Sequence, residues 1–253
     1  MTSSVYALNA ANFFMADVRD GLGPFLGVFL QQKNWSPASI GLVMTIGGYA
    51  GMVATAPLGA LVDATHAKRA IMIGSALTIS VASMAILFMP SFPATAASQI
   101  ATGIAGAAVV PAIAGITLGL VRQAGYAHQL GRNEAFNHAG NVFAAFAGGG
   151  LGYLFGLQAV FYVLAAMALA SVIAVLAIAP RDIDNKAARG LSEKAGAVQS
   201  SLGVLFTCKP LIGLTARILD GTGRVNVGLG VVMTAQCIGA ASSPALRCCC
   251  GSD

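Results

Sequence analysis

The chain has 253 residues and a net charge of +5, but 57% of its residues are hydrophobic and only 9% are charged. A soluble domain normally carries about 25% charged residues, and the bases here are neither gathered on one face nor interleaved with stacking aromatics, which argues against a nucleic-acid-binding protein. Apolar runs of about 20 residues, the length that crosses a bilayer as a helix, recur along the sequence. We therefore expect an all-α membrane protein held in the lipid bilayer, with no nucleic acid as partner.

Six membrane spans are predicted, with polar or turn-forming residues between them. Trp35 suits a membrane interface, and Pro37 suits the start of a helix. The polar stretch 122–134 predicts a loop, and a tight turn is expected near Gly156 and Gln158. In chain order, the predicted spans cover residues 7–31, 38–62, 70–89, 94–121, 136–158 and 159–179.

The first predicted span has a polar face. Asn9, Asn12, Asp17, Arg19 and Asp20 fall within an arc of about 160° on a helical wheel. A charge at membrane depth costs at least ~2.5–3.5 kcal/mol, so such groups usually line a cavity or a relay. One interpretation is that the arginine neutralises an acid and holds the bundle together. The other is a wet cavity in which a carboxylate binds substrate or carries a proton, and Asp20→Asn should then lose transport while the protein is still made and inserted.

Three of the spans carry a small residue at every fourth position. Such a row lies along one helix face, and in lipid small side chains let two backbones approach closely. We expect the rows to pack the helices into a compact bundle, or to let them slide against each other. The rows are Gly47, Gly51, Thr55 and Gly59; Gly103, Ala107, Pro111, Gly115 and Gly119; and Gly140, Ala144, Gly148, Gly152 and Gly156.

The fifth predicted span adds a polar cluster at its start. His138 and Asn141 lie three residues apart and therefore share a helix face. They are candidates for a cavity gate or a pH-sensitive group, and the alternative is a helix end that faces water.

The distribution of bases predicts which way the chain is oriented. Cytoplasmic loops of membrane proteins keep an excess of Lys and Arg, so we expect a cytoplasmic N-terminus in a bacterial-type inner membrane. The loops after spans one, three and five hold only Lys33. Those after spans two, four and six hold Lys68, Arg69, Arg122, Arg132, Arg181, Lys186, Arg189 and Lys194.

The loop between the second and third spans reads GALVDATHAKR. This stretch resembles the signature loop between helices two and three of the major facilitator superfamily, which has a Gly, then an Asp, then a basic cluster. Gly59, Asp63, Lys68 and Arg69 match, while Ala64 stands where the family has its first base. The six spans and the charged segment after them resemble the N-terminal half of that family.

The resemblance implies a secondary transporter of small molecules. Family members have two six-helix halves, with the substrate site near the midplane and alternating access by rocking of one half on the other. It implies that Asp63 holds one conformation by pairing near helix ends. The family's fourth helix often carries an arginine tied to proton coupling, and Gln99 occupies that place here, so a coupling proton stays open.

The second half is short in this chain. We expect a six-helix bundle over 1–180, a charged cytoplasmic linker over 181–201, and a remnant of the C-terminal half over 202–253 with one further predicted transmembrane helix at 225–246. The pattern suggests an internal deletion, hence an incomplete chain. The alternatives are a non-transporting remnant, or a half-size membrane subunit that must form a homodimer.

No enzyme is predicted. The three histidines are scattered, the five cysteines lack a metal-binding spacing, and neither an HExxH nor a Gly-x-Ser-x-Gly motif is present. We therefore expect no catalytic residue, no metal site and no cofactor.

Overall fold

The computed structural model describes residues 3–20 and 22–189, except the side chains of residues 20, 24 and 189. The predicted remnant at 202–253, its helix at 225–246 and most of the predicted linker lie outside these residues. The described elements are α1 (Ser3–Asp20), α2 (Gly23–Gln32), α3 (Pro37–Ala64), α4 (Lys68–Phe88), α5 (Phe92–Phe155), α6 (Gln158–Ala177) and the short 3-10 helices η1 (Pro180–Asp182) and η2 (Ala187–Arg189).

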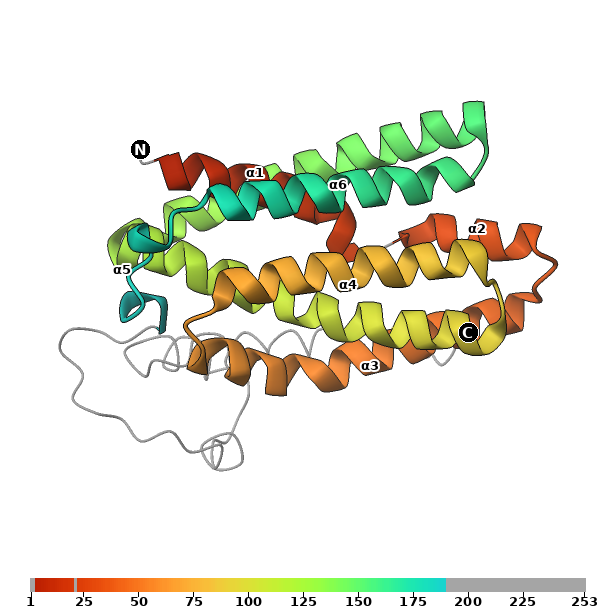
Figure 1. Cartoon of the computed structure of the whole chain (residues 1–253), viewed down its shortest axis with the longest axis horizontal. Coiled ribbons are helices and arrows are strands. Elements are labelled where there is room, and N and C mark those ends of the chain that lie inside the picture. The colour runs from red at the N-terminus through yellow and green to blue at the C-terminus, as the bar shows by residue number, and fades with distance from the viewer. Residues whose placement is uncertain (1–2, 21, 190–253) are drawn as a thin grey trace, which may run out of the picture.

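Helix α5 is two helices joined at a sharp bend. Arg122 has φ 55° and ψ −177°, which are not helical angles. The chain reverses there, so that the two arms of α5 run in opposite directions and diverge from the bend (Figure 1). With α1 and α2 counted as one pass and the arms of α5 as two, the described chain passes six times along the bundle. α5 contacts α1, α3, α4 and α6, which places it at the centre of the packing.

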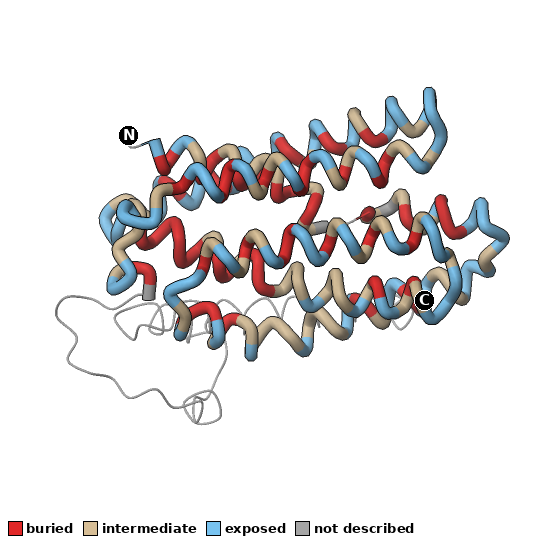
Figure 2. Tube along the Cα trace, in the orientation of Figure 1, coloured by how far each residue is buried: buried red, intermediate tan, exposed pale blue. Residues whose placement is uncertain are grey.

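The outer surface of the bundle is apolar. The helices α3, α4, α5 and α6 are each long and apolar enough to cross a membrane. Large side chains such as Val53, Val81, Phe146 and Tyr153 are exposed on them, while buried residues follow the inward faces (Figure 2). An exposed apolar surface of this extent is favourable only in lipid, so the predicted all-α membrane protein is confirmed.

The first predicted span is not one continuous helix. It was expected over 7–31, but α1 ends at Asp20 and α2 begins at Gly23, where φ is +46°. Pro24 lies in the first turn of α2 and has no N–H to continue a helical ladder from α1. A glycine and a proline next to each other therefore break the first pass near its middle.

The predicted loop at 122–134 is also wrong. Apart from the bend at Arg122, these residues are helical and form the start of the second arm of α5. The stretch contains no proline but holds two glycines, so helix propensity alone does not decide its structure. Gln129 and Asn133 are buried on the inward face of this helix, whereas Gln123 and Glu134 are exposed.

The small-residue rows pack helices closely, as predicted. A Cβ added at Gly47 would lie 3.0 Å from both the Cβ and the carbonyl oxygen of Gln99, and one added at Gly51 would lie 3.1 Å from the carbonyl oxygen of Gly103. Both distances are shorter than ordinary van der Waals contact. Backbones of α3 and of the first arm of α5 therefore touch, as small residues in lipid allow.

The start of α1, the end of α3, the start of α4, the bend of α5 and the end of α6 all lie at one end of the bundle (Figure 1). We call this the N-terminal end.

Candidate functional site

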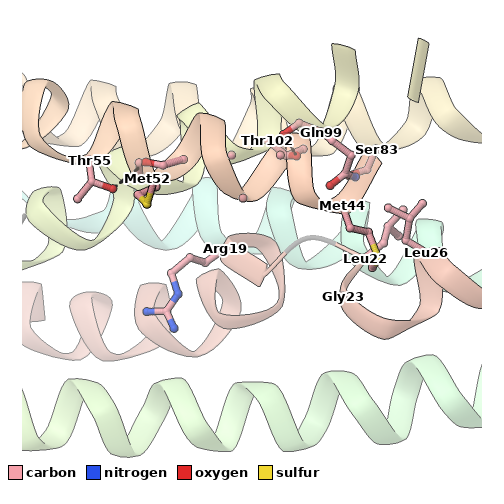
Figure 3. Close-up of a pocket in the computed structure, with 15 residues that line it drawn as sticks. Arg19, Leu22, Gly23, Leu26, Met44, Met52, Thr55, Ser83, Gln99 and Thr102 are labelled. Atoms are coloured by element: carbon pink, nitrogen blue, oxygen red, sulfur yellow. Dashed lines mark hydrogen bonds between the residues drawn. The ribbon is translucent and has the colours of Figure 1, made fainter. Parts of the chain in front are cut away.

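A pocket of about 400 Å³ opens beside the break between α1 and α2. We call it the helix-break pocket. It is bounded by the break itself, by the middle of α3, by the first arm of α5 and by one residue of α4. Figure 3 shows the Arg19 side chain on the α1 side and Met52, Thr55, Gln99 and Thr102 on the side of α3 and α5. Its lining residues are Arg19, Leu22, Gly23, Leu26, Met44, Gly47, Gly48, Gly51, Met52, Thr55, Ser83, Gln99, Thr102, Gly103 and Ala107.

The pocket begins halfway along the helices that form it and extends away from the N-terminal end, towards Leu26 and Ser83. Arg19 is near the middle of the first pass, Gly51 is near the middle of α3, and Gly103 is near the middle of the first arm of α5. A broken helix at such a depth is tolerated in a membrane only where it faces protein or a water-filled cavity. The broken helix and the pocket therefore lie next to each other inside the bundle.

The polar groups of the pocket differ in what they offer a ligand. The Thr55 hydroxyl donates to the Gly51 carbonyl at 2.7 Å, and the Thr102 hydroxyl donates to the Gln99 carbonyl at 3.0 Å. Because their protons are used, both hydroxyl oxygens can only accept. Arg19 is the only ionisable residue among the described lining residues, so it supplies the charge of the site.

Of the six predicted cavity residues whose side chains the structure describes, only Arg19 lines this pocket. Asp17 and Asn141 are half-buried, His138 is exposed, and the side chain of Asp20 lies outside the described part. Asn12 is buried, and its amide donates to the Leu8 carbonyl at 2.9 Å. A role for these residues in substrate or proton binding stays a prediction.

Asn9 belongs to a buried amide network that the sequence did not predict. The Gln129 amide donates to Asn9 Oδ1 at 2.7 Å and to Asn133 Oδ1 at 2.9 Å. The Asn133 amide in turn donates to Thr117 Oγ1 at 2.8 Å, and that hydroxyl donates to the Ile113 carbonyl. The network therefore ties α1 to both arms of α5 near the bend.

A spacing signal could have found these residues. Gln129, Asn133 and Asn137 recur every fourth position just before the small-residue row that starts at Gly140, and all four are buried. The polar row and the small row form one continuous helix face. The apparent loop hid this continuity, because the span was expected to begin only at residue 136.

The basic pair of the loop between α3 and α4 binds the ends of two helices. The Lys68 ammonium donates to the carbonyls of Val62 at 2.7 Å and Thr65 at 2.9 Å, at the end of α3. Arg69 donates from Nε to the Val175 carbonyl at 3.2 Å and from Nη2 to the Leu176 carbonyl at 3.0 Å, at the end of α6. Cations are favourable at helix C-termini, where carbonyls lack partners.

The other signature residues support this arrangement. Gly59 and Asp63 are buried in the last turns of α3, and Asp63 has a polar or charged partner within the protein. The stem of Lys68 lies across Gly115, where an added Cβ would come within 2.7 Å of the Lys68 Cδ. The loop is thus anchored to three helices, and a role of Asp63 in conformational change stays a prediction.

Lys68→Met is expected to destabilise the chain by about 2 kcal/mol, or about 6 °C in melting temperature, because two helix-end carbonyls lose a charged donor. Thermal unfolding in detergent measures the effect. Lys186→Met, at an exposed position, is the control and should change little. Equal melting temperatures for the two variants would rule out a stabilising role for the Lys68 contacts.

The residues after α6 fold back over the N-terminal end. Asp182 accepts a hydrogen bond from the Ser4 hydroxyl at the start of α1. Asp184 makes an ion pair with Arg122 at 3.4 Å, and its backbone N–H donates to the Gly119 carbonyl at 3.0 Å. The predicted linker therefore begins as a docked segment. No group of three metal-ligating side chains occurs among the described residues.

Comparison with known proteins identifies relatives of one kind. The family model described as Major Facilitator Superfamily matches residues 3–219. An uncharacterized MFS-type transporter of Mycobacterium tuberculosis strain CDC 1551 / Oshkosh is 49% identical over 191 residues, which cover 75% of this chain and 46% of that protein. A protein of the same description from strain ATCC 25618 / H37Rv gives the same values. The chain thus spans about half the length of the curated relatives it matches.

Proposed function

The chain belongs to the major facilitator superfamily, and from that premise we propose that it forms one wall of the substrate site of a secondary transporter with alternating access. The observation that carries the proposal is the helix-break pocket, in which a broken helix meets the middle of two others. Secondary transporters of several folds place their substrates near the midplane beside discontinuous helices. The family is one of transporters, so enzyme activity forms no part of the proposal.

The network around Gln129 and the anchored loop support movement of this half as one body. Rocking of one half against another requires that the helices of each half stay together. Hydrogen bonds join α1 to the second arm of α5 and that arm to the first, and Arg69 joins the start of α4 to the end of α6. These contacts lie at the N-terminal end, away from the helix-break pocket between α1, α3 and α5.

The distribution of Lys and Arg supports one orientation of the chain in the membrane. Described bases such as Lys68, Arg69, Arg122 and Arg181 lie at the N-terminal end, whereas Lys33 lies between α2 and α3 at the other end. The excess of Lys and Arg on cytoplasmic loops supports an N-terminal end that faces the cytoplasm. We place the chain in a bacterial-type inner membrane on this basis, and its coupling ion, a proton included, stays open.

The substrates that match the pocket best carry a carboxylate or another strong acceptor, because Arg19 is a charged donor. This arginine already has a partner within the protein, but its five N–H groups can serve more than one acceptor. The hydroxyl oxygens of Thr55 and Thr102 would accept from a donor on the same molecule, and Met44 and Met52 would contact an apolar part. Thioethers adapt to irregular apolar shapes.

A ligand screen tests this assignment. The purified chain in detergent is heated with panels of small organic acids, organic cations and neutral polar compounds. A ligand at about 100 times its Kd should raise the melting temperature by about 5–10 °C. We expect the shift with an organic acid, its loss in Arg19→Gln and its retention in Arg181→Gln, an exposed position outside the pocket. A ligand that stabilises both variants equally would place its site elsewhere.

The length of the chain calls for a second test. The match covers 46% of the relatives, so the opposite wall of a complete site must come from further chain or from a second copy. Oligomeric state in detergent and flux in liposomes separate these cases. A homodimer with flux supports a half-size transporter, whereas a monomer that binds ligand without flux supports an incomplete chain and rejects the homodimer.

A further inference from the structure

A second cavity of about 330 Å³ lies at the N-terminal end, between the start of α4, the end of α6 and the segment that follows α6. We call it the basic pocket. Its described lining includes His66, Lys68 and Arg69 and no acidic residue. None of its lining residues lines the helix-break pocket. The basic side chains around it would attract a negatively charged ligand.

The cations of the basic pocket keep their charge in the fold. Arg69 donates to the backbone carbonyls of Val175 and Leu176, which are neutral and fix the side chain without cancelling its charge. Arg69 uses two of its five N–H groups in this way, which leaves three for a ligand. His66 and Lys68 also have a partner within the protein, so Arg69 is the residue we expect to contact the ligand directly.

The nearby acids are occupied elsewhere. Asp182 accepts from Ser4 and lies 4.0 Å from Arg181, and Asp184 pairs with Arg122. Asp63 has a partner of its own and does not line the pocket. Even if Asp63 offsets Lys68, the charge of Arg69 is left for the cavity. A phosphate or carboxylate would therefore meet an attractive field there.

The opposite wall of the pocket is apolar and continues along the membrane surface of the bundle. Ile73 and Leu176 line the pocket, and Leu176 is 57% exposed. Leu77 lies one turn further along α4, Ile173 lies one turn back along α6, and both are exposed. Because α4 and α6 pack side by side, these residues extend from the pocket towards the bilayer core.

We propose that the basic pocket binds a phosphate group of an anionic lipid, with Arg69 at the phosphate and an acyl chain against Leu176 and the outer faces of α4 and α6. Basic pockets between membrane helices commonly hold anionic head groups. Free phosphate shares the charged half of this chemistry, but it would make no use of the apolar wall.

The test uses the whole chain in a nonionic detergent, with native mass spectrometry to count bound lipid. Phosphatidylglycerol should bind at about tenfold lower concentration than phosphatidylcholine, whose head group has no net charge. Ala70→Glu places a carboxylate in the pocket at an exposed position and should weaken phosphatidylglycerol binding about tenfold. Ala127→Glu adds the same charge at an exposed position outside the pocket and should leave binding unchanged.

Loss of fold is separable from loss of binding. A Glu in the first turn of α4 interacts favourably with the helix dipole, so Ala70→Glu should melt at the wild-type temperature. Ala67→Glu is a second variant that adds a carboxylate to the pocket, and we expect the same result from it. A measurement with inorganic phosphate distinguishes the two sources of the anion. Free phosphate is the ligand if it stabilises the chain, if phosphatidylglycerol adds no further stabilisation, and if Ala70→Glu abolishes the effect. Equal retention of the two lipids, or equal binding by Ala70→Glu and Ala127→Glu, overturns the proposal.

Discussion

Gly140→Ala is expected to destabilise the bundle by about 3 kcal/mol and to lower its melting temperature by about 10 °C. Gly140 lies where the second arm of α5 crosses α1, and the space for a side chain is filled by backbone. An added Cβ would overlap the Phe13 carbonyl oxygen and would lie 2.9 Å from the Ala16 Cβ. A carbonyl in a helix cannot move aside without breaking its own hydrogen bond, so the two helices must separate.

The matched control for Gly140→Ala is Gly150→Ala in the same arm. No atom lies within 4 Å of a Cβ built at Gly150, and Ala is a better helix former than Gly by about 1 kcal/mol. This variant should melt at or slightly above the wild-type temperature. Thermal unfolding of both purified variants in one detergent measures the difference. Similar melting temperatures would show that the close approach of α1 and α5 does not stabilise the fold.

Gln129→Leu is expected to destabilise the chain by about 3 kcal/mol, because one amide group satisfies two buried acceptors. Gln129 is 2% exposed, and its amide donates to Asn9 and to Asn133. The Asn9 amide nitrogen has no partner among the described residues, so the substitution would leave both polar atoms of that side chain unpaired. A buried polar group without a partner costs about 1–3 kcal/mol.

Gln123→Leu in the same arm of α5 is the control for Gln129→Leu. Gln123 is exposed, so the substitution tests the change in hydrophobicity without touching the network. We expect its melting temperature to stay within a few degrees of the wild type and that of Gln129→Leu to fall by about 10 °C. If the two variants have the same melting temperature, the amide network contributes no net stability to the bundle.

The sequence by itself determined which segments form the long apolar helices. Spans two, three and six end within a few residues of the predicted bounds. The length of an apolar run and the turn residues that bound it can be recognised from the local sequence alone. Small residues every fourth position predicted close helix packing for the same reason. The sequence also singles out Arg19, because a charge within an apolar run is costly unless it faces water or a partner, and its role in a substrate cavity stays a prediction.

Only the tertiary structure decided where the first helix breaks, since membrane helices tolerate Gly and Pro and the sequence cannot tell a kink from an interruption. It also decided that residues 123–134 are helical, because Gln129 bonds to Asn9 on α1 and Asn133 bonds to Thr117 on the first arm of α5. Local composition does not show such partners. Lys68 and Arg69 are loop charges by sequence, yet they bind the ends of α3 and α6. A polar residue in a membrane protein acquires its role from the group that satisfies it, and that group lies far away in sequence.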